Sequence, residues 1–340
     1  MWNSLRLSCR SVQGEFLATV KLAPTHFAYP ESPSDRTRWI LERRPEKAPV
    51  SAERPYAFLF EHERGPDGEL WPTATIFLTN KECPWRCLMC DLWRNTSDTA
   101  VPSEAIPRQI ETALAQLPPA RQVKLYNSGS FFDAQAIPRE DWNSIANLVN
   151  GFERVIVECH PALVNGAVGE FAEMLDGKFE VAMGLETAHP EVLGKLNKRM
   201  TLGMFAGAAE LLHEMEVDLR TFVLVKPPFM DDEAAVRWGK KSIDFAVECG
   251  ASVVSLIPTR VGNGALNELA RQGLFGEPRL DMVEEIADYG VGLEKARVFA
   301  DLWDARRFSK CPKCFEAREE RLHRMNCTQT ILPRVDCECR

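Results

Sequence analysis

The chain has 340 residues, of which 45% are hydrophobic and 26% are charged, with 20 Gly and 22 Pro. This is the composition of a globular protein, and it excludes collagen-like, low-complexity and mostly disordered chains. The net charge of −8 argues against a protein that is basic throughout and binds nucleic acid over its whole surface.

The N-terminal stretch, residues 1–54, has no clean period, because five prolines and several arginines interrupt it. We interpret it as an extension that packs over another part of the fold. From Tyr56 the pattern sharpens. Two apolar runs, residues 56–60 and 73–78, flank the turn sequence Gly65-Pro66-Asp67-Gly68 and predict a β-hairpin.

A strand–helix alternation follows. The predicted strands cover residues 75–79, 122–126, 154–158, 179–183, 219–225 and 252–257. Helical patterns lie between them, including one that Thr201 caps and one that opens at Asp231. Six β-then-α units in series imply a parallel sheet covered by helices, either curled into a partial barrel or open and doubly wound. In both arrangements ligands gather beyond the C-terminal ends of the strands.

The C-terminal part, from about residue 281, is charged and partly helical. Residues 306–324 hold seven Lys and Arg against three Glu, a local charge of +4 that leaves −12 on the rest of the chain. This is compatible with a basic face, although charge runs usually form solvated faces. No apolar run approaches the roughly 18 residues of a membrane helix, and charges interrupt every candidate signal-peptide core near the N-terminus. We therefore expect a cytoplasmic protein without membrane contact.

The cysteines are the most informative residues. Eight of the eleven fall in two groups, namely Cys83, Cys87 and Cys90, and then Cys311, Cys314, Cys327, Cys337 and Cys339. In a chain without a secretion signal, grouped thiols indicate metal ligands or redox groups before disulfides. The three others are interpreted as core or incidental residues: Cys9, Cys159 and Cys249.

The first group has the spacing C-x3-C-x2-C and lies in the loop after the strand at 75–79. Thiolates suit iron–sulfur clusters and zinc, and a [4Fe–4S] cluster ordinarily takes four cysteines. Three ligands from one loop would leave one iron open, and an open metal position distinguishes catalytic from closed structural sites. A structural zinc site is the alternative.

This motif, after the first strand of a six-unit β/α chain, resembles the radical S-adenosylmethionine (SAM) superfamily. The resemblance implies a partial six-stranded (β/α)6 barrel, with an N-terminal extension and a cysteine-rich C-terminal tail added here. It implies that Cys83, Cys87 and Cys90 are the catalytic and metal-binding residues, holding a [4Fe–4S] cluster whose open iron chelates SAM. Reductive cleavage of SAM then gives a 5′-deoxyadenosyl radical that abstracts a substrate hydrogen. The electron comes from an external donor such as flavodoxin or ferredoxin.

The resemblance also implies cofactor-binding residues near the first two strands. Met89 stands before the last cysteine, where the family usually has an aromatic residue, and it can pack against an adenine or a cluster. The family has a Gly-rich stretch after the second strand, whose backbone binds the SAM amino group. Here the corresponding residues are Asn127, Ser128, Gly129 and Ser130, with a single glycine. Ordinary turn chemistry is the alternative for them.

Other predicted cofactor-binding residues follow the later strands. Glu186 ends the fourth strand and can accept hydrogen bonds from ribose hydroxyls or an amino group; a helix-capping acid is the alternative. Arg199, or in second place Lys198, can pair with the SAM carboxylate, unless this is a solvated basic turn. Lys226 and Pro258 end the fifth and sixth strands, in segments that resemble those approaching the adenine and substrate.

The second cysteine group begins with the CxxC pair Cys311 and Cys314. A CxxC pair followed by later cysteines is typical of a closed, tetrahedral zinc site. A second iron–sulfur cluster and unliganded thiols are the alternatives. A four-ligand site needs one thiol fewer than the five available. We therefore expect Cys311 and Cys314 as ligands, together with two of the three later ones, Cys327, Cys337 and Cys339.

We expect three regions: an N-terminal extension and hairpin over 1–72, a radical SAM core over 73–280, and a C-terminal extension with the cysteine-rich metal site over 281–340. The strings at 127–131 and 184–187 are among those that look closest to one branch of the superfamily. That branch joins the radical SAM domain of elongator-type tRNA-modifying enzymes with the radical SAM subunit of archaeosine synthase.

This branch implies a modified nucleobase or tRNA as substrate, and a basic tail is compatible with RNA contact. Two alternatives stay open. One is a radical SAM enzyme acting on a small molecule or natural product. The other is a non-catalytic iron–sulfur or zinc protein that binds a partner or carries electrons. The sequence does not indicate the oligomeric state.

Overall fold

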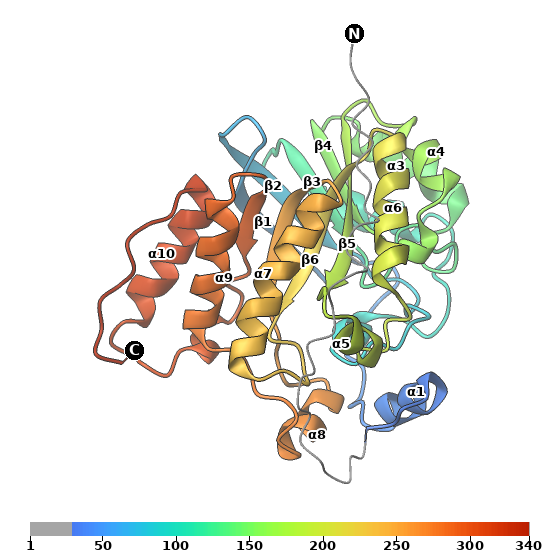
Figure 1. The fold of residues 1–340 in the computed structure, drawn as a ribbon. Helices are drawn as coiled ribbons and strands as arrows, with labels where there is room; N and C mark the ends of the chain where they lie inside the picture. The colour runs from blue at the N-terminus through green and yellow to red at the C-terminus, as the bar shows by residue number, and fades with distance from the viewer. Residues whose placement is uncertain (1–28, 340) are drawn as a thin grey trace.

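A single sheet with helices packed along it forms the body of the computed structural model, which describes residues 29–339 (Figure 1). The eight strands of this described part are β1 (Ala57–Arg64), β2 (Leu70–Phe77), β3 (Gln122–Tyr126), β4 (Arg154–Glu158), β5 (Lys178–Glu186), β6 (Asp218–Val225), β7 (Ala251–Pro258) and β8 (Arg297–Ala300). They lie in the sheet in sequence order, with β1 antiparallel to β2 and β2 to β8 parallel. The part of the N-terminal extension at 1–28 lies outside the described residues.

The six predicted strands are present as β2 to β7, and the predicted hairpin is β1 with β2. The strand count of six was wrong, because the hairpin adds β1 at one edge and β8 extends the other. The β8 segment has only four residues, too few for a recognisable alternation. The doubly wound alternative is also excluded, because its strand order would reverse at a switch point.

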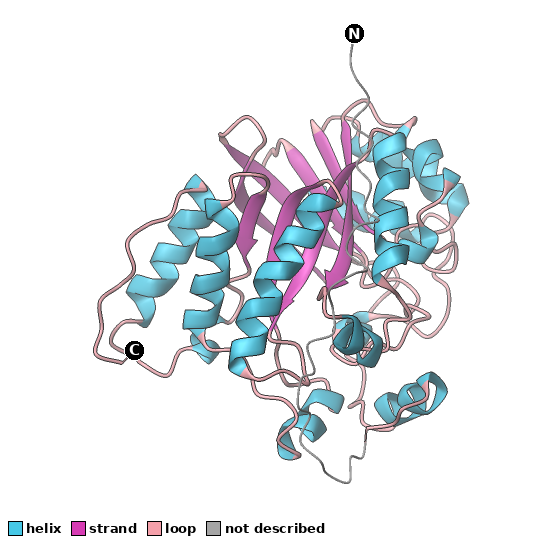
Figure 2. Cartoon of the chain, in the orientation of Figure 1, coloured by secondary structure: helices cyan, strands magenta, loops and turns pink. Residues whose placement is uncertain are grey.

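The helices lie outside the sheet, and α7 crosses in front of it in the view of Figure 2. They are α1 (Pro33–Leu41), α2 (Ala105–Leu114), α3 (Trp142–Val149), α4 (Gly166–Ala172), α5 (Pro190–Lys195), α6 (Leu202–Glu214), α7 (Asp232–Glu248), α8 (Ala265–Arg271), α9 (Leu280–Gly292) and α10 (Phe315–Thr328). The two predicted N-caps are confirmed: Thr201 accepts a hydrogen bond from the Met204 amide and Asp231 from the Ala234 amide. Within residues 29–339 we find no helix with the length and apolarity needed to cross a bilayer.

The sheet curls strongly. Glu63 on β1 and Arg220 on β6 are five strand positions apart, yet the Arg220 Nη2 and Glu63 Oε1 atoms are 2.6 Å apart. The two edge strands also meet, because Arg297 on β8 donates to the Arg64 carbonyl on β1 at 2.7 Å. Contacts of this kind require the sheet to curl back on itself as a half-barrel.

The interior near the N-terminal ends of the parallel strands is filled by charged side chains. Arg220 binds Glu180 at 2.5 Å as well as Glu63, and Lys124 binds Glu63 at 2.7 Å. Arg154 adds a 2.9 Å contact with the second oxygen of Glu180. All five side chains are buried. Buried charges persist only where they are paired, so this network closes one end of the barrel.

The free edge of β8 is covered by two amide side chains of α10. Asn326 accepts from the Ala300 amide and donates to its carbonyl, each at 2.9 Å. Gln329, which follows the last turn of α10, makes the same pair of bonds to Val298, at 2.6 and 3.0 Å. The two side chains thus satisfy the groups that another strand would otherwise bind, and the sheet ends at β8.

The opposite end of the barrel carries a second apolar cluster. It joins α1, α5, α8 and the cysteine-bearing loop after β2, with Leu88 completely buried among Trp39, Leu196 and Leu266. Figure 1 places α1, α5 and α8 at the same end of the molecule. The described part of the N-terminal extension therefore packs against the loop that carries Cys83, Cys87 and Cys90.

Candidate functional site

The first cysteine group lies beyond the C-terminal end of β2, which is where the strand order predicts a site. The Trp85 amide donates to the Cys83 sulfur and the Leu92 amide donates to the Cys90 sulfur. Burial raises the pKa of all three thiols, that of Cys90 to about 12. A bound cation would offset this penalty, because it stabilises the thiolate form directly.

The spacing of these three sulfur atoms also matters. They are not among the groups of ligand atoms that converge to within 4.8 Å of one another, in contrast to four cysteines of the tail. One small ion binds sulfur atoms that lie close together, whereas a cluster spreads its thiolates over different irons. Three thiols in one loop leave one iron of a cluster without a protein ligand, so this donor set fits a [4Fe–4S] cluster with an open position.

Asn263, in the turn after β7, holds the cysteine loop by its backbone. Its Nδ2 donates to the Leu88 carbonyl at 2.7 Å and to the Cys90 carbonyl at 3.2 Å. Its Oδ1 accepts from the Leu266 amide at 2.8 Å, at the start of α8. The sequence analysis missed this residue. Its signal was a Gly-Asn-Gly turn directly after a predicted strand.

The segment between α5 and α6 holds the loop from another side. The Leu88 amide donates to the Leu196 carbonyl at 2.8 Å, and Asn197 Nδ2 donates to the Arg86 carbonyl at 2.9 Å. Trp93 Nε1 adds a 3.1 Å bond to the Cys90 carbonyl. All these contacts are made to the backbone, so they fix the loop without occupying the thiols.

Replacing Asn263 with Ala is expected to lower the unfolding free energy by about 1–3 kcal/mol, because the buried Leu88 carbonyl loses its donor and the Cys90 carbonyl keeps only that of Trp93. Iron bound to the loop should also be lost faster to a chelator. The matched control is Asn267→Ala, since Asn267 supports the same turn from an exposed position without touching the loop. Equal chelation rates for the two variants would show that Asn263 does not hold the loop.

The turn after β3 lies against this loop. A Cβ placed on Gly129 would be 3.3 Å from the Cβ of Cys83, so the close approach favours glycine. The Asn127 amide donates to the half-buried Glu158 carboxyl group at 3.0 Å, and the amides of Ser128 and Gly129 face the same group. Because those N–H groups are taken, the turn offers carbonyl and side-chain groups to a ligand. That chemistry suits an ammonium group.

Asn127 carries the clearest sign of a missing ligand. Its side chain is fully buried, and neither its Oδ1 nor its Nδ2 has a hydrogen-bond partner among the described residues. The Nδ2 lies 3.8 Å from the Cβ position of Gly129, beside Cys83. Leaving a buried amide unpaired is costly, so this arrangement fits a bound polar group.

Ser130, the last residue of the predicted stretch, is engaged elsewhere. Its hydroxyl donates to the Cys159 sulfur at 3.4 Å and accepts from the His160 amide at 3.3 Å. Ser128 instead lies 3.2 Å from the Tyr56 hydroxyl. Ser130 therefore fastens the turn to the end of β4.

Glu158 makes a pH-dependent contribution to stability. Burial raises its pKa from 4.5 to about 7 in the folded chain, despite the three amide donors. The folded state therefore binds more protons than the unfolded state between these values, and its stability falls as the pH rises through them. The penalty above pH 7 is on the order of 3 kcal/mol.

The variant Glu158→Gln cannot ionise but keeps an oxygen acceptor for the turn. Its unfolding free energy in urea, measured on metal-free chain, should lack this loss between pH 5 and pH 8. The wild-type value should fall relative to the variant over that range. Parallel pH profiles for the two chains would contradict the assignment.

Glu186 and Lys198 form a buried ion pair at the end of β5. Lys198 Nζ lies 2.5 Å from both Glu186 Oε1 and the Gly184 carbonyl. His160 Nε2 donates to the Lys198 carbonyl at 3.0 Å, and its ring stacks on Trp85 with centroids 3.8 Å apart. This places a positive and a negative group beside the cysteine loop.

The other predicted cofactor-binding residues are less directly placed. Arg199 is directed toward α1, where it donates to the Pro33 carbonyl at 2.8 Å. Lys226 pairs with Asp232 at 2.5 Å. Pro258 is the last residue of β7 and is paired with Val225 of β6. Met89 packs against the second apolar cluster. Each of these four residues therefore makes its contacts within the protein.

Left-handed backbone conformations gather at this end of the barrel. Of the eleven non-glycine residues with positive φ in the described part of the chain, five lie here with φ between 54° and 65°: Ser128, Glu186, Asn197, Arg199 and Lys226. Such a conformation is unfavourable for a residue with a Cβ, and it persists where the surroundings impose it. Four of these five are residues that the sequence analysis singled out.

The tail cysteines are brought together in part. Cys311, Cys314, Cys337 and Cys339 converge, whereas Cys327 lies on α10 with its sulfur 3.9 Å from His323 Nε2. The structure thus selects two of the three later cysteines that the sequence analysis left open, and it leaves Cys327 apart.

The chain was also compared with known proteins, and no protein-family model matches it. An uncharacterized protein of Methanocaldococcus jannaschii is 26% identical over 311 residues, which cover 84% of this chain and 85% of that protein. Two relatives are named archaeosine synthase subunit beta. The one from Methanosarcina acetivorans is 28% identical over 79% of this chain and 83% of its own length. The one from Thermococcus kodakarensis is 31% identical over 54% of this chain and 59% of its own length.

Among solved structures, Elp3 of Methanocaldococcus infernus has a TM-score of 0.50 and 15% identity, covering 64% of this chain and 58% of Elp3. At this identity the likeness shows the fold, a curled half-barrel sheet of the type found in radical SAM enzymes. Coproporphyrinogen III oxidase of Escherichia coli, described as a radical SAM enzyme, has a TM-score of 0.43. The fold shared with Elp3 and the names of the two relatives bear out the resemblance to one radical SAM branch that the sequence predicts.

Proposed function

We propose that this chain is a radical SAM enzyme in which Cys83, Cys87 and Cys90 hold a [4Fe–4S] cluster. The observation that carries the proposal is the cysteine loop itself. It carries three thiols beyond the C-terminal end of β2, while Asn263, Leu196 and other groups hold its backbone. When bound, the cluster supplies an electron that splits SAM into methionine and a 5′-deoxyadenosyl radical, which takes hydrogen from a substrate.

We assign the binding of SAM to groups that surround the loop. Asn127 has a buried amide with no partner among the described residues, and Gly129 lets this turn approach Cys83 closely. The carbonyl groups of this turn accept hydrogen bonds from the amino group of SAM. Lys198, rather than Arg199, pairs with its carboxylate, because Lys198 is the buried cation next to the loop and Arg199 is directed toward α1.

The opposite charges of Glu186 and Lys198 have a further role in this proposal. SAM carries an ammonium and a carboxylate group. Each member of the ion pair can release the other and bind the SAM group of opposite charge. Glu186 then accepts from the amino group or the ribose hydroxyls. Lys226 and Pro258 line the approach of the adenine and the substrate. Met89 packs beside the cofactor from within the loop.

For the substrate we propose a modified nucleobase in tRNA. The support is the name that two relatives carry, archaeosine synthase subunit beta. The same name supports a partner subunit for this chain. An external one-electron donor such as flavodoxin or ferredoxin completes the system, because no residue of the site is itself a reductant. We retain the regions 1–72, 73–280 and 281–340 as extension, core and metal-binding tail.

The test is anaerobic reconstitution with iron and sulfide, followed by electron paramagnetic resonance of the reduced protein with and without SAM. We expect a [4Fe–4S] signal that SAM shifts, and a Lys198→Met chain whose signal shifts only at higher SAM concentration. A Lys240→Met chain provides the comparison, since Lys240 on α7 pairs with Glu285 on α9 at 2.7 Å and has no role in the proposed site. A full cluster whose signal SAM leaves unchanged would contradict the proposal.

A further inference from the structure

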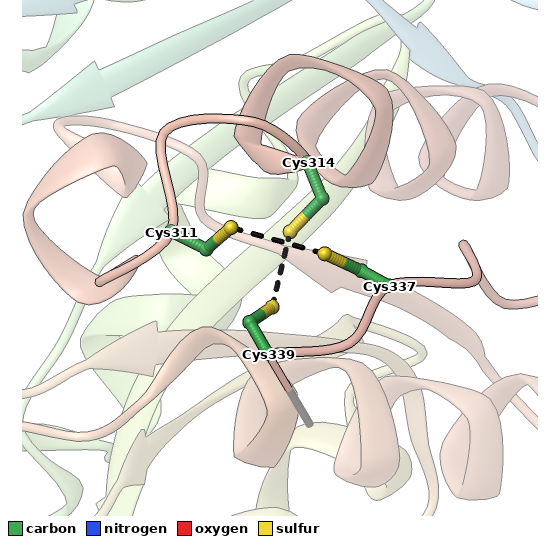
Figure 3. A group of neighbouring side chains, drawn as sticks. All are labelled: Cys311, Cys314, Cys337 and Cys339. Atoms are coloured by element: carbon green, nitrogen blue, oxygen red, sulfur yellow. Dashed lines mark hydrogen bonds between the residues drawn. The ribbon is translucent and has the colours of Figure 1, made fainter.

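The tail holds a second group of sulfur atoms with a different geometry. The Sγ atoms of Cys311, Cys314, Cys337 and Cys339 all lie within 4.8 Å of one another. Cys311 and Cys337 are 3.8 Å apart and Cys314 and Cys339 are 3.5 Å apart. Figure 3 shows the four side chains pointing at a common centre from two segments of the chain. Four thiolates around a tetrahedral ion with bonds of 2.3 Å lie about 3.8 Å from each other.

From this arrangement we infer that the tail binds one zinc ion through Cys311, Cys314, Cys337 and Cys339, in a closed structural site. The spacing decides against the alternatives. A disulfide would bring two sulfur atoms to about 2.05 Å. A [4Fe–4S] cluster would place each thiolate on a different iron and so hold the sulfur atoms farther apart. Four soft ligands in a tetrahedron suit zinc, and they leave no open position for catalysis.

The surroundings of the four cysteines supply hydrogen-bond donors. The amides of Lys313 and Cys314 donate to the Cys311 sulfur, and Arg318 contacts the Cys314 sulfur. Arg318 is itself held by Glu284, through a bond of 2.7 Å. Four thiolates on a divalent ion carry a net negative charge, so donors and a guanidinium group next to the sulfur atoms stabilise the site.

The site ties the end of the chain to the start of α10. Between Gln329 and Cys337 the described chain has no helix or strand. It is held by Arg321, which donates to the Leu332 carbonyl at 2.7 Å, and by the Arg334–Asp288 ion pair at 2.8 Å. Because α10 also covers the free edge of β8, the zinc ion fixes the element that seals the barrel's seam. Metal binding of this kind contributes directly to folding stability.

The test uses the full chain with Cys83, Cys87 and Cys90 all replaced by Ala, so that the proposed cluster site cannot contribute metal. We expect one zinc per chain by plasma mass spectrometry. The double variant Cys337→Ser/Cys339→Ser should lose it, and Cys327→Ser should keep it. Cys327 is the matched control, since it lies on α10 outside the group. Zinc retained by the double variant would overturn the assignment.

A second measurement does not depend on how the variants fold. Cobalt added to the chain after removal of zinc should give the intense visible bands of a tetrahedral thiolate site. The removal should also raise hydrogen exchange in α10 and β8. Iron with sulfide in the tail, or intact masses that show two disulfides, would overturn the proposal. This result is independent of SAM chemistry, so failure here leaves the proposed function standing, and failure of that function leaves the zinc site.

Discussion

Replacing Cys87 with Ala is expected to abolish binding of the [4Fe–4S] cluster and all reductive cleavage of SAM. The loop offers three thiols as iron ligands. The contacts that hold the loop in place engage its backbone carbonyl and amide groups, so they supply no further ligand. Two thiols cannot hold three irons. The change removes one sulfur atom from a loop fixed by its backbone, so the fold should persist.

Iron and sulfide counts after reconstitution test this prediction, with circular dichroism to show that the chain is folded. The control is Cys249→Ala, which removes a partly buried thiol at the end of α7 and should leave the counts unchanged. A folded Cys87→Ala chain that still binds four irons and cleaves SAM would refute the role of this cysteine.

The second large effect concerns stability. Arg220→Met should lower the unfolding free energy by about 3–5 kcal/mol, because the buried carboxylates of Glu63 and Glu180 lose the cation that they share. Arg220 is 2% exposed and contacts both carboxylates within 2.6 Å. Lys124 and Arg154 still touch these carboxylates, so the loss is not that of a fully isolated pair.

Urea unfolding monitored by fluorescence provides the measurement. The control is Arg139→Met, since Arg139 forms an ion pair with Glu170 on the surface and both side chains are at least half exposed. Exposed pairs contribute about 0–1 kcal/mol. If the two variants were equally stable, the buried ion pairs of Arg220 would contribute no more to stability than an exposed pair, contrary to the prediction.

Much of this fold follows from periodicity and chain order. β3 and β4 have the bounds that the sequence predicts, because each is a short apolar run between a turn and a helix. The sequence did not predict β8, because its four residues are stabilised on one side by the side chains of Asn326 and Gln329. Pairing between a strand and helix side chains leaves no alternation in the sequence. β8 is therefore the one strand of the described sheet that the sequence does not predict.

The sequence likewise predicts some features of the candidate site and not others. The position of the cysteine loop follows from its place after a predicted strand, because the ends of parallel strands meet at one edge. The choice between Lys198 and Arg199 depends on which side chain faces inward. Adjacent residues in a turn with left-handed backbone give no period from which to infer this. Asn263 was missed since its contacts are to backbone atoms far away in sequence.

The choice of tail ligands was also beyond the sequence. Five thiols within a short stretch offer several sets of four, and only the path of residues 329–338 back along α10 selects Cys337 and Cys339. Cys327 was excluded by the helix itself, which turns its side chain toward His323 one turn away. Such a choice depends on three-dimensional geometry rather than on spacing.

The central claim is that this chain cleaves SAM by radical chemistry at Cys83, Cys87 and Cys90. The most direct measurement is 5′-deoxyadenosine, assayed by mass spectrometry after anaerobic reconstitution and addition of SAM and dithionite. We predict deoxyadenosine from the wild-type chain and none from the chain in which the three cysteines are Ala. Equal amounts from both chains, or a wild-type loop that takes up zinc and no iron, would contradict the claim.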